Sequence, residues 1–290
     1  YRNRKTYATG HGVSGCWKFD GESISSVFTS FIPAYEILPT STTIDDIDAS
    51  ILDPASYIGN DYQEQLDKLS NFVEMYRQWI DKTKVAAQSL QIEFQKYAND
   101  NINDCYECLE RMHTTLNFLK DNLNAFKAFN VANETILLQR MGNYHEKEKS
   151  YETKDYSDVH FHWRPFQLAF ILNSLESVLN PKSKYRNDLD LIWVPTGGGK
   201  TEAYLFAIAA VIAYRRFANK DGYEGVTVIM RYTLRLLTSQ QFERASKMIC
   251  ALEYIRRNYD DHLLGDTEIS IGLWILSLIH ISEPTRHSLI

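Results

Sequence analysis

Residues 191–201 combine the residue types that bind the phosphates of a nucleotide. An apolar run ends at Pro195, three glycines follow, and Lys200 and Thr201 come next, ahead of a helix predicted over residues 202–216. Glycine lacks a Cβ, so the backbone can turn its N–H groups toward an anion. The helix adds its positive N-terminal end. Lys200 can reach the β- and γ-phosphates, and the Thr201 hydroxyl can bind Mg²⁺.

This order of strand, glycine-rich loop and helix predicts a P-loop that binds ATP with Mg²⁺. The longest form of the motif has a glycine where Val194 stands, whereas the shorter form, Pro-Thr-Gly-x-Gly-Lys-Thr, is typical of helicase-type NTPases. The alternative, a glycine-rich turn that binds nothing, is disfavoured by the position of the lysine between strand and helix. We expect Lys200 and Thr201 to be catalytic, with Thr201 as a Mg²⁺ ligand. The predicted phosphate-binding residues are Thr196, Gly197, Gly198, Gly199, Lys200 and Thr201.

A second candidate site precedes the P-loop. Gln167 opens a predicted helix that ends near Leu179. Its carboxamide offers both the donor and the acceptor that the edge of an adenine base requires. Arg164 and Phe166 stand beside it and could stack on the base. We therefore expect Arg164, Phe166 and Gln167 to bind ATP as well; the alternative is a glutamine at a helix N-terminus that faces water.

A third candidate site follows a β-branched run over residues 225–230, which predicts a buried strand. Residues 233–240 fit the pattern T-x-R-x-L-x-x-Q and open a helix predicted to reach residue 257. The pattern resembles the motif with which RecA-like helicase domains hold the sugar-phosphate backbone, and hydroxyls, a guanidinium and helix N-terminal N–H groups all bind phosphate. In the alternative, the arginines are solvated or paired with Glu243. The predicted nucleic-acid-binding residues are Arg231, Thr233, Arg235 and Gln240.

The elements around these motifs predict the fold class. Strands over 191–194, 225–230 and 268–274 alternate with helices, which predicts a doubly wound parallel sheet. Upstream, apolar residues recur every three or four positions. They predict helices over 66–80 and 85–97, from residue 104, and over 126–138. The chain is therefore expected to be α/β, a partial RecA-like P-loop parallel sheet preceded by a mainly α-helical accessory module.

The sequence divides into four predicted parts, with a charged linker over residues 142–158. Residues 276–290 continue no earlier pattern and look like translated sequencing adapter, so they are expected not to be native; the alternative is a genuine apolar strand followed by a loop. The parts are an irregular or β N-terminal segment (1–60), the helical accessory module (61–150), the first part of a RecA-like helicase ATP-binding domain (151–275) and the tail (276–290).

Composition narrows the function further. The chain has 290 residues, a net charge of −6, 44% hydrophobic and 23% charged residues, which is typical of a globular protein. It has no global basic field, so any nucleic-acid site must be local. The four cysteines read as reduced thiols of a cytoplasmic protein, and Cys105-x-x-Cys108 lacks the second pair that zinc needs. No apolar run is long enough to span a membrane, so no membrane partner is predicted.

Several segments together resemble the large helicase-like ATPases of bacterial DISARM anti-phage systems. The segment around Arg235 is the most particular of them, and the P-loop is generic. The resemblance covers roughly residues 1–275. The segments are 7–12, 31–36, 130–133 with Gln139, 164–167, 195–201 and 230–242.

The resemblance implies a superfamily-two, RecA-like motor that acts on DNA, rather than RNA, in antiviral defence, with other defence-system proteins as further partners. Gln167, Lys200, Thr201 and Arg235 carry over to matching roles. Such a motor also needs a D-E-x-H box and an arginine finger. Neither is found before residue 275, so this chain is expected to bind nucleotide without hydrolysing it. The alternative is a nucleotide-gated switch or assembly ATPase without translocation, in which the helical module binds a partner.

Overall fold

A computed structural model describes residues 7–8, 15–29, 44, 47–144, 156–194, 199–219, 225–232, 235–258 and 264–274, and only the backbone of residues 142–144 and 235–238. The chain divides into two compact units, residues 1–41 and 42–290. In the first unit, β1 (Gly15–Asp20) and β2 (Ser23–Thr29) form an antiparallel hairpin around a turn in which Gly21 has φ +61°.

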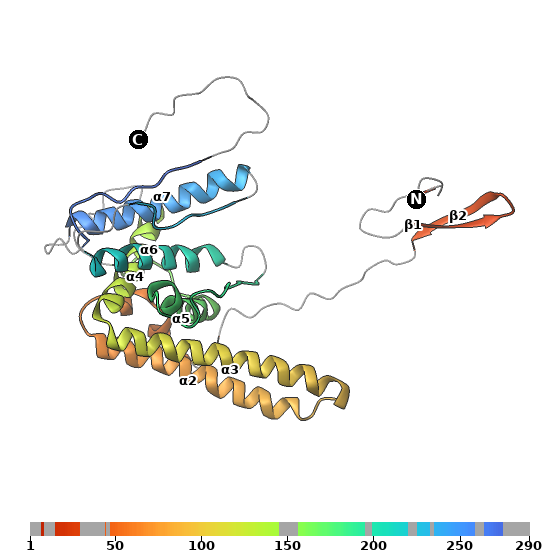
Figure 1. The fold of residues 1–290 in the computed structure, drawn as a ribbon, viewed down its shortest axis with the longest axis horizontal. Helices are drawn as coiled ribbons and strands as arrows, with labels where there is room; N and C mark the ends of the chain where they lie inside the picture. The colour runs from red at the N-terminus through yellow and green to blue at the C-terminus, as the bar shows by residue number, and fades with distance from the viewer. Residues whose placement is uncertain are drawn as a thin grey trace, which may run out of the picture. The chain divides into compact units, whose positions relative to one another are not determined.

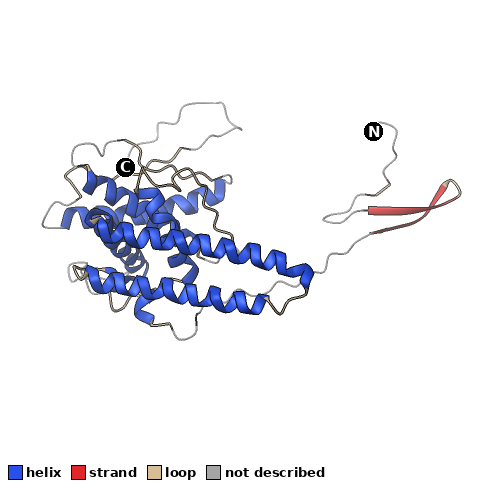
Figure 2. Ribbon diagram, turned by 60° about the horizontal axis from the view of Figure 1, so that its bottom comes forward, coloured by secondary structure: helices blue, strands red, loops and turns tan. Residues whose placement is uncertain are grey.

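The second unit begins with two short helical turns and a long helical hairpin. These are α1 (Ala49–Leu52), the 3₁₀ helix η1 (Pro54–Tyr57), α2 (Tyr62–Ala87) and α3 (Ile92–Asp121). The Asp61 carboxylate begins α2 by accepting the Glu64 N–H at 3.1 Å. Figures 1 and 2 show α2 and α3 side by side along most of their length.

The predicted helix over residues 85–97 is wrong, because a turn separates α2 from α3 at this point. Gln95 Nε2 donates to the carbonyls of Gln88 and Leu90 at 3.3 and 2.9 Å. It thereby pairs with carbonyl groups of the turn that follows α2. The other predicted helices of the module correspond to α2, α3 and α4.

Helix α4 (Leu123–Tyr144) is the centre of the second unit. Nearly every residue from 125 to 138 is buried, as expected for a helix that is covered on all sides. It packs against α6 and α7 along its length, and against η1. Its buried polar side chains have hydrogen-bond partners within the protein. Asn130 Nδ2, for example, donates to Gln65 Oε1 of α2 at 2.8 Å. A buried polar group that lacked such a partner would cost stability.

Three further helices bring the predicted site to this centre. They are α5 (Pro165–Leu179), α6 (Lys200–Ala218) and α7 (Arg235–Asn258). Helix α5 packs between α3 and α6. Phe206 of α6 is fully buried, with edge-to-face contacts to Phe129 at 5.4 Å and to Trp163 at 5.6 Å. One hydrophobic core therefore joins residues on both sides of the boundary expected near residue 150.

The segments predicted as parallel strands have no regular secondary structure in the described part of the chain. Residues 189–194, 225–232 and 268–274 carry exposed apolar side chains, including Leu189 (94%) and Trp193 (88%). The sheet recorded among the described residues is the β1–β2 hairpin. A strand needs a neighbour for its backbone hydrogen bonds, and these segments contact helices instead. Arg215 Nη1, for example, donates to Thr227 Oγ1 at 2.9 Å.

Candidate functional site: a cationic pocket at the start of α6

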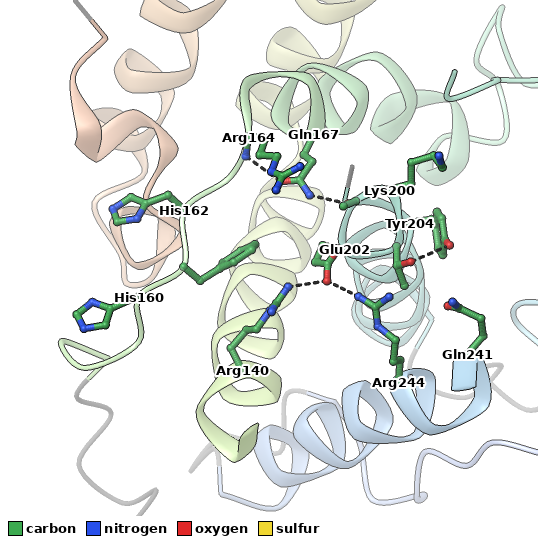
Figure 3. A pocket seen from close by; sticks show the side chains of 13 residues that line it. Arg140, His160, His162, Arg164, Gln167, Lys200, Glu202, Tyr204, Gln241 and Arg244 are labelled. Carbon is green, nitrogen blue, oxygen red and sulfur yellow. Dashed lines mark hydrogen bonds and ion pairs between the residues drawn. The ribbon is translucent and has the colours of Figure 1, made fainter. Parts of the chain in front are cut away.

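A pocket of about 610 Å³ opens where α4, α5, α6 and α7 meet (Figure 3). The residues that line it, among those described, include Gly199, Lys200 and Thr201 from the predicted P-loop and Arg164 and Gln167 from the predicted adenine site. The structure therefore brings two segments together that lie far apart in the sequence. The other lining residues are Arg140, His160, Phe161, His162, Glu202, Tyr204, Gln241 and Arg244.

Residues 156–164 lead into the pocket, and side-chain hydrogen bonds attach this segment to α4. The Tyr156 hydroxyl donates to Glu134 Oε1 at 2.8 Å, and Trp163 Nε1 donates to Asn133 Oδ1 at 3.0 Å. Trp163 and Asn133 are both buried, where such bonds are costly to lose. This segment delivers the start of α5 to the pocket.

Gln167 connects the start of α5 to the phosphate loop. Its Oε1 accepts the Arg164 backbone N–H at 2.8 Å, and its Nε2 donates to the Gly199 carbonyl at 2.6 Å. Pro165 at the first helical position has no N–H to satisfy. Gln167 is only 2% exposed, so the alternative of a glutamine that faces water is wrong.

Gly199 ends the phosphate loop with a backbone that only glycine adopts readily. Its φ is +86°, and a Cβ added there would lie 2.8 Å from Gln167 Nε2. The glycine therefore permits both the left-handed turn and the close approach of α5. Thr196, Gly197 and Gly198 lie outside the described residues.

Lys200 and Thr201 begin α6. Lys200 Nζ donates to the Val194 carbonyl at 2.5 Å, so the side chain folds back toward the start of the loop. The Thr201 hydroxyl is 3.1 Å from the Tyr204 hydroxyl. A positive helix end, a lysine and a hydroxyl fit the triphosphate and Mg²⁺ of a bound nucleotide.

Glu202 makes the most concentrated charge contact of the pocket. Its Oε1 accepts Arg140 Nη2 at 2.5 Å and also Arg244 Nη2. Figure 3 shows the two guanidinium groups on either side of the carboxylate. Arg140 comes from α4 and Arg244 from α7, so the cluster joins three helices. Gln139 Nε2 adds a bond to the Arg244 carbonyl at 3.1 Å.

The residues predicted to bind nucleic acid are only partly described. Arg231 and Gln240 are exposed, Thr233 lies outside the described residues, and Arg235 begins α7 but its side chain is not described. Glu243, the alternative ion-pair partner, pairs with Lys247 at 3.1 Å. Phe166 lies on α5 beside Gln167, is half-buried and does not line the pocket.

Sequence reasoning missed the polar residues contributed by the neighbouring helices. Gln241 and Arg244 line the pocket directly after the T-x-R-x-L-x-x-Q motif, and Gln241 Oε1 is buried with no hydrogen-bond partner among the described residues. Close by, burial and a hydrogen bond with Tyr204 raise the pKa of Tyr232. The available signal was the spacing of Gln241 and Arg244, three apart and thus on one helix face. Arg140 had no such signal.

The described residues contain no group of three or more His, Cys, Asp or Glu side chains that could hold a metal ion. They also contain no helix with the length and hydropathy of a membrane span.

Comparison with known proteins bears on the whole chain. Residues 165–271, which run from the start of α5 past α7, match the DEAD/DEAH box helicase family, and this match implies a RecA-like fold for the segment. The chain is 36% identical over 300 residues to DISARM protein DrmA of Bacillus paralicheniformis. That similarity covers 98% of this chain and 26% of the relative, so the chain spans about a quarter of the relative's length. The predicted resemblance is confirmed: the chain is similar over nearly its whole length to part of a DISARM protein, and a segment of it matches the DEAD/DEAH box helicase family.

Proposed function

We propose that the chain is the ATP-binding part of a helicase-like, nucleic-acid-dependent ATPase, a DNA translocase or helicase of a cytoplasmic phage-defence system. The pocket at the start of α6 supports this most directly, because it joins Lys200, Thr201 and the carboxamide of Gln167. ATP and Mg²⁺ would be held by the P-loop residues, with Arg164 near the base, whereas Phe166 lies outside the lining of this pocket. Other defence-system proteins would be partners of the longer protein.

The parallel sheet belongs to the same proposal. Residues 189–194 and 225–232 carry exposed apolar side chains such as Leu191 (76%) and Val226 (77%), whereas the strands of a parallel sheet are covered on both faces. We infer that these segments are strands of the RecA-like sheet in the longer protein, preceded by the helical accessory module at 61–150. In the longer protein the D-E-x-H box and arginine finger would supply hydrolysis, and this chain alone would bind without turning nucleotide over.

Lys200→Ala tests the nucleotide site. The variant is expected to lose Mg-ATP binding by about 100-fold or more, because charge-assisted contacts to phosphate are among the strongest hydrogen bonds. The measurement is the titration of a fluorescent ATP analogue against the 290-residue chain. Lys184→Ala, which removes an exposed lysine that does not line the pocket, is the control and should bind like the parent. Unchanged affinity in Lys200→Ala would refute the P-loop assignment.

Arg235→Ala tests the nucleic-acid site in the longer protein. If Arg235 holds the sugar-phosphate backbone, the affinity for single-stranded DNA should fall equally for all sequences. The slope of log Kd against log salt concentration should become smaller by about one. Loss confined to one sequence would contradict a backbone role.

The second candidate is a nucleotide-gated switch whose helical module binds a partner. The end of the α2–α3 hairpin favours it, because Val85, Ile92 and Tyr97 are 68%, 86% and 67% exposed. Stimulation of ATP hydrolysis by DNA in the longer protein would select the motor, and stimulation by a protein partner alone would select the switch.

A further inference from the structure

The Glu202 cluster holds more positive charge than its carboxylate can neutralise. The Glu202 side chain is 8% exposed, and both Arg140 and Arg244 bond to the same oxygen, Oε1. A buried carboxylate requires a cation, but one guanidinium is enough for that purpose. The second guanidinium is therefore surplus to the stability of Glu202.

The pocket around this cluster is cationic. Its described lining includes four cationic side chains, Arg140, Arg164, Lys200 and Arg244, and one carboxylate, Glu202. Such a concave surface attracts a polyanion, and guanidinium groups bind phosphate with short, charge-assisted hydrogen bonds. A nucleotide phosphate chain is the polyanion that the neighbouring P-loop residues select.

The two arginines are held differently. Arg140 lies 4.9 Å over the ring of Phe161, on a helix that is buried on nearly all sides, and its side chain is 29% exposed. Arg244 is 39% exposed, and it lies one helical turn from Gln241, whose Oε1 is buried and has no hydrogen-bond partner in the described part of the chain. Arg244 is therefore the arginine that can turn toward a ligand at the smaller cost.

We propose that Arg244 is a phosphate-binding residue of the nucleotide site, that Glu202 holds it in the nucleotide-free protein, and that Arg140 is a positioning residue that frees it. When the nucleotide binds, Arg244 exchanges Glu202 for a phosphate oxygen, while Glu202 stays paired with Arg140. No buried charge is left without a partner during this exchange. This inference rests on the proposed nucleotide site and adds two residues to it.

The exchange has a consequence for α7. This helix begins with the segment predicted to bind nucleic acid, and Arg244 lies on the same helix. Occupancy of the nucleotide site thereby acts on the element that holds the nucleic acid. The accessory helix α4 takes part through Arg140, so the helical module forms one wall of the nucleotide site.

The test is a set of variants of the 290-residue chain: Arg244→Met, Arg140→Met, Glu202→Gln and the double variant Arg140→Met/Glu202→Gln. Methionine keeps the aliphatic stem of each arginine and its packing. The dissociation constants of Mg-ATP and of adenosine are measured for each variant, together with its thermal midpoint. Arg244→Met should weaken ATP binding about tenfold or more and leave adenosine binding unchanged.

The double variant separates the exchange from a merely structural role. Arg140→Met should also weaken ATP binding, because Arg244 is then the remaining arginine of the described ion pairs of Glu202. Adding Glu202→Gln removes that competition and should restore most of the lost affinity. If the double variant binds ATP as weakly as Arg140→Met, or more weakly, the exchange is overturned. Equal ATP affinity in Arg244→Met and the parent also overturns it.

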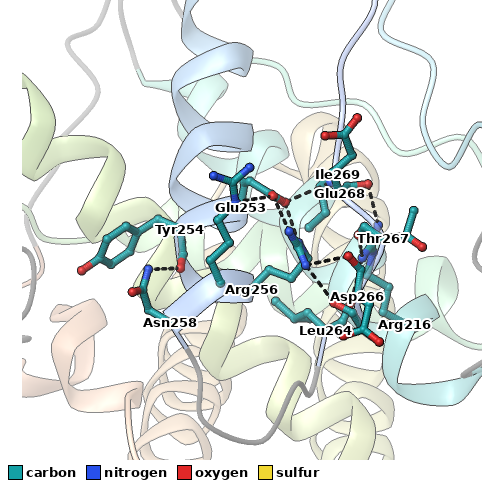
Figure 4. A network of polar contacts seen from close by, with 12 residues as sticks. Arg216, Glu253, Tyr254, Arg256, Asn258, Leu264, Asp266, Thr267, Glu268 and Ile269 are labelled. Atoms are coloured by element: carbon teal, nitrogen blue, oxygen red, sulfur yellow. Dashed lines mark hydrogen bonds and ion pairs between the residues drawn. The ribbon is translucent and has the colours of Figure 1, made fainter.

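The second cluster of this kind provides a matched control (Figure 4). Glu253 accepts bonds from Arg256 and from Arg257, also on α7, but none of these residues lines the pocket. Arg257→Met should therefore leave ATP binding unchanged, and a comparable loss in this control overturns the inference.

If a single variant fails to fold, Arg140→Lys, which keeps the charge, should bind ATP within about threefold of the parent. A larger loss in Arg140→Lys with an unchanged thermal midpoint also counts against the inference. Failure of the proposed function itself looks different, since the parent chain would then not bind ATP at all.

Discussion

At the scale of single residues, the site depends on one glycine and one glutamine that lie against each other. Gly199 takes φ +86° and leaves room for Gln167 Nε2, which donates to its carbonyl. The same carboxamide accepts the Arg164 N–H through Oε1. Gln167 therefore holds Gly199, the described end of the predicted phosphate loop, independently of any contact with a base.

Replacement of Gln167 distinguishes these two roles. Gln167→Ala removes two buried hydrogen bonds and should weaken ATP binding about tenfold, since a net hydrogen bond contributes roughly 1 kcal/mol. If Gln167 also reads adenine, the affinity for GTP should fall much less than that for ATP. Competition titrations with the two nucleotides measure this. Equal losses for ATP and GTP would leave Gln167 as a loop-positioning residue and contradict the predicted contact with adenine.

At the scale of elements, the C-terminal turns of α6 and α7 fix the segment that follows α7. Arg216 Nη1 donates to the carbonyls of Leu264 and Thr267, each at 2.7 Å. Arg256 Nη1 donates to the Gly265 and Asp266 carbonyls at 3.1 and 2.9 Å, as Figure 4 shows. Arginines near helix C-termini suit the helix dipole. In the described part of the chain, these arginine side chains, rather than a neighbouring strand, bind the backbone carbonyls of residues 264–267.

Glu253 orients one of these arginines, and its ionisation makes the cluster sensitive to acid. Hydrogen bonds from Arg256 and from the Ile269 N–H, which donates to Glu253 Oε2 at 3.0 Å, together lower the pKa of Glu253 to about 2. A lowered pKa in the folded state stabilises the protein above the unfolded pKa of about 4.3. This stabilisation is lost as the pH falls toward 2.

Glu253→Gln should therefore destabilise the 290-residue chain by roughly 1–2 kcal/mol at pH 7, and the difference from the parent should shrink between pH 4.5 and pH 2. Urea unfolding at several pH values measures both effects. Glu110→Gln is the comparison, because its ion pair with Lys184 leaves both side chains about 60% exposed and should contribute little. A Glu253→Gln effect that is constant with pH would show that the ionised form is not the stabilising one.

At the scale of the whole molecule, the second unit combines a helical core with segments that expose apolar side chains. The helices α2 to α7 share one hydrophobic core. Residues 189–194 and 225–232, in contrast, leave Leu191, Trp193 and Ile229 at least 76% exposed. Exposed apolar residues in extended segments indicate surfaces that another part of a protein covers.

If these segments join the proposed parallel sheet, their amides should exchange at different rates in the two contexts. In the 290-residue chain, peptides from 189–194 and 226–232 should exchange rapidly, because no strand holds them. In the longer protein, exchange should be on the order of 100-fold slower. Hydrogen–deuterium exchange with mass spectrometry measures this, and peptides from α4 should be protected in both proteins. Rapid exchange of the two segments in the longer protein would refute the sheet.

The sequence alone determined the local features of this protein. Periodic apolar residues predicted the central parts of α2 and α4, because such helices follow from spacing along the chain, and the positions of the motifs predicted α5, α6 and α7. The glycines, lysine and threonine of the predicted P-loop indicated a phosphate site because that motif, too, is defined by residue types at fixed spacing along the chain. The helix over 85–97 was wrong because a turn separates α2 from α3 there, and the Gln95 side chain, which donates to the Leu90 carbonyl, belongs to that turn's contacts.

Only the tertiary structure decided which distant residues complete the pocket. Arg140, Glu202 and Arg244 come from three helices, and no spacing along the chain relates residue 140 to residue 202. The same holds for the bond between Gln167 and Gly199, which are 32 residues apart. Sequence patterns report contacts within one helix or strand, whereas contacts between elements arise from packing, which brings α4 against α6 and α7.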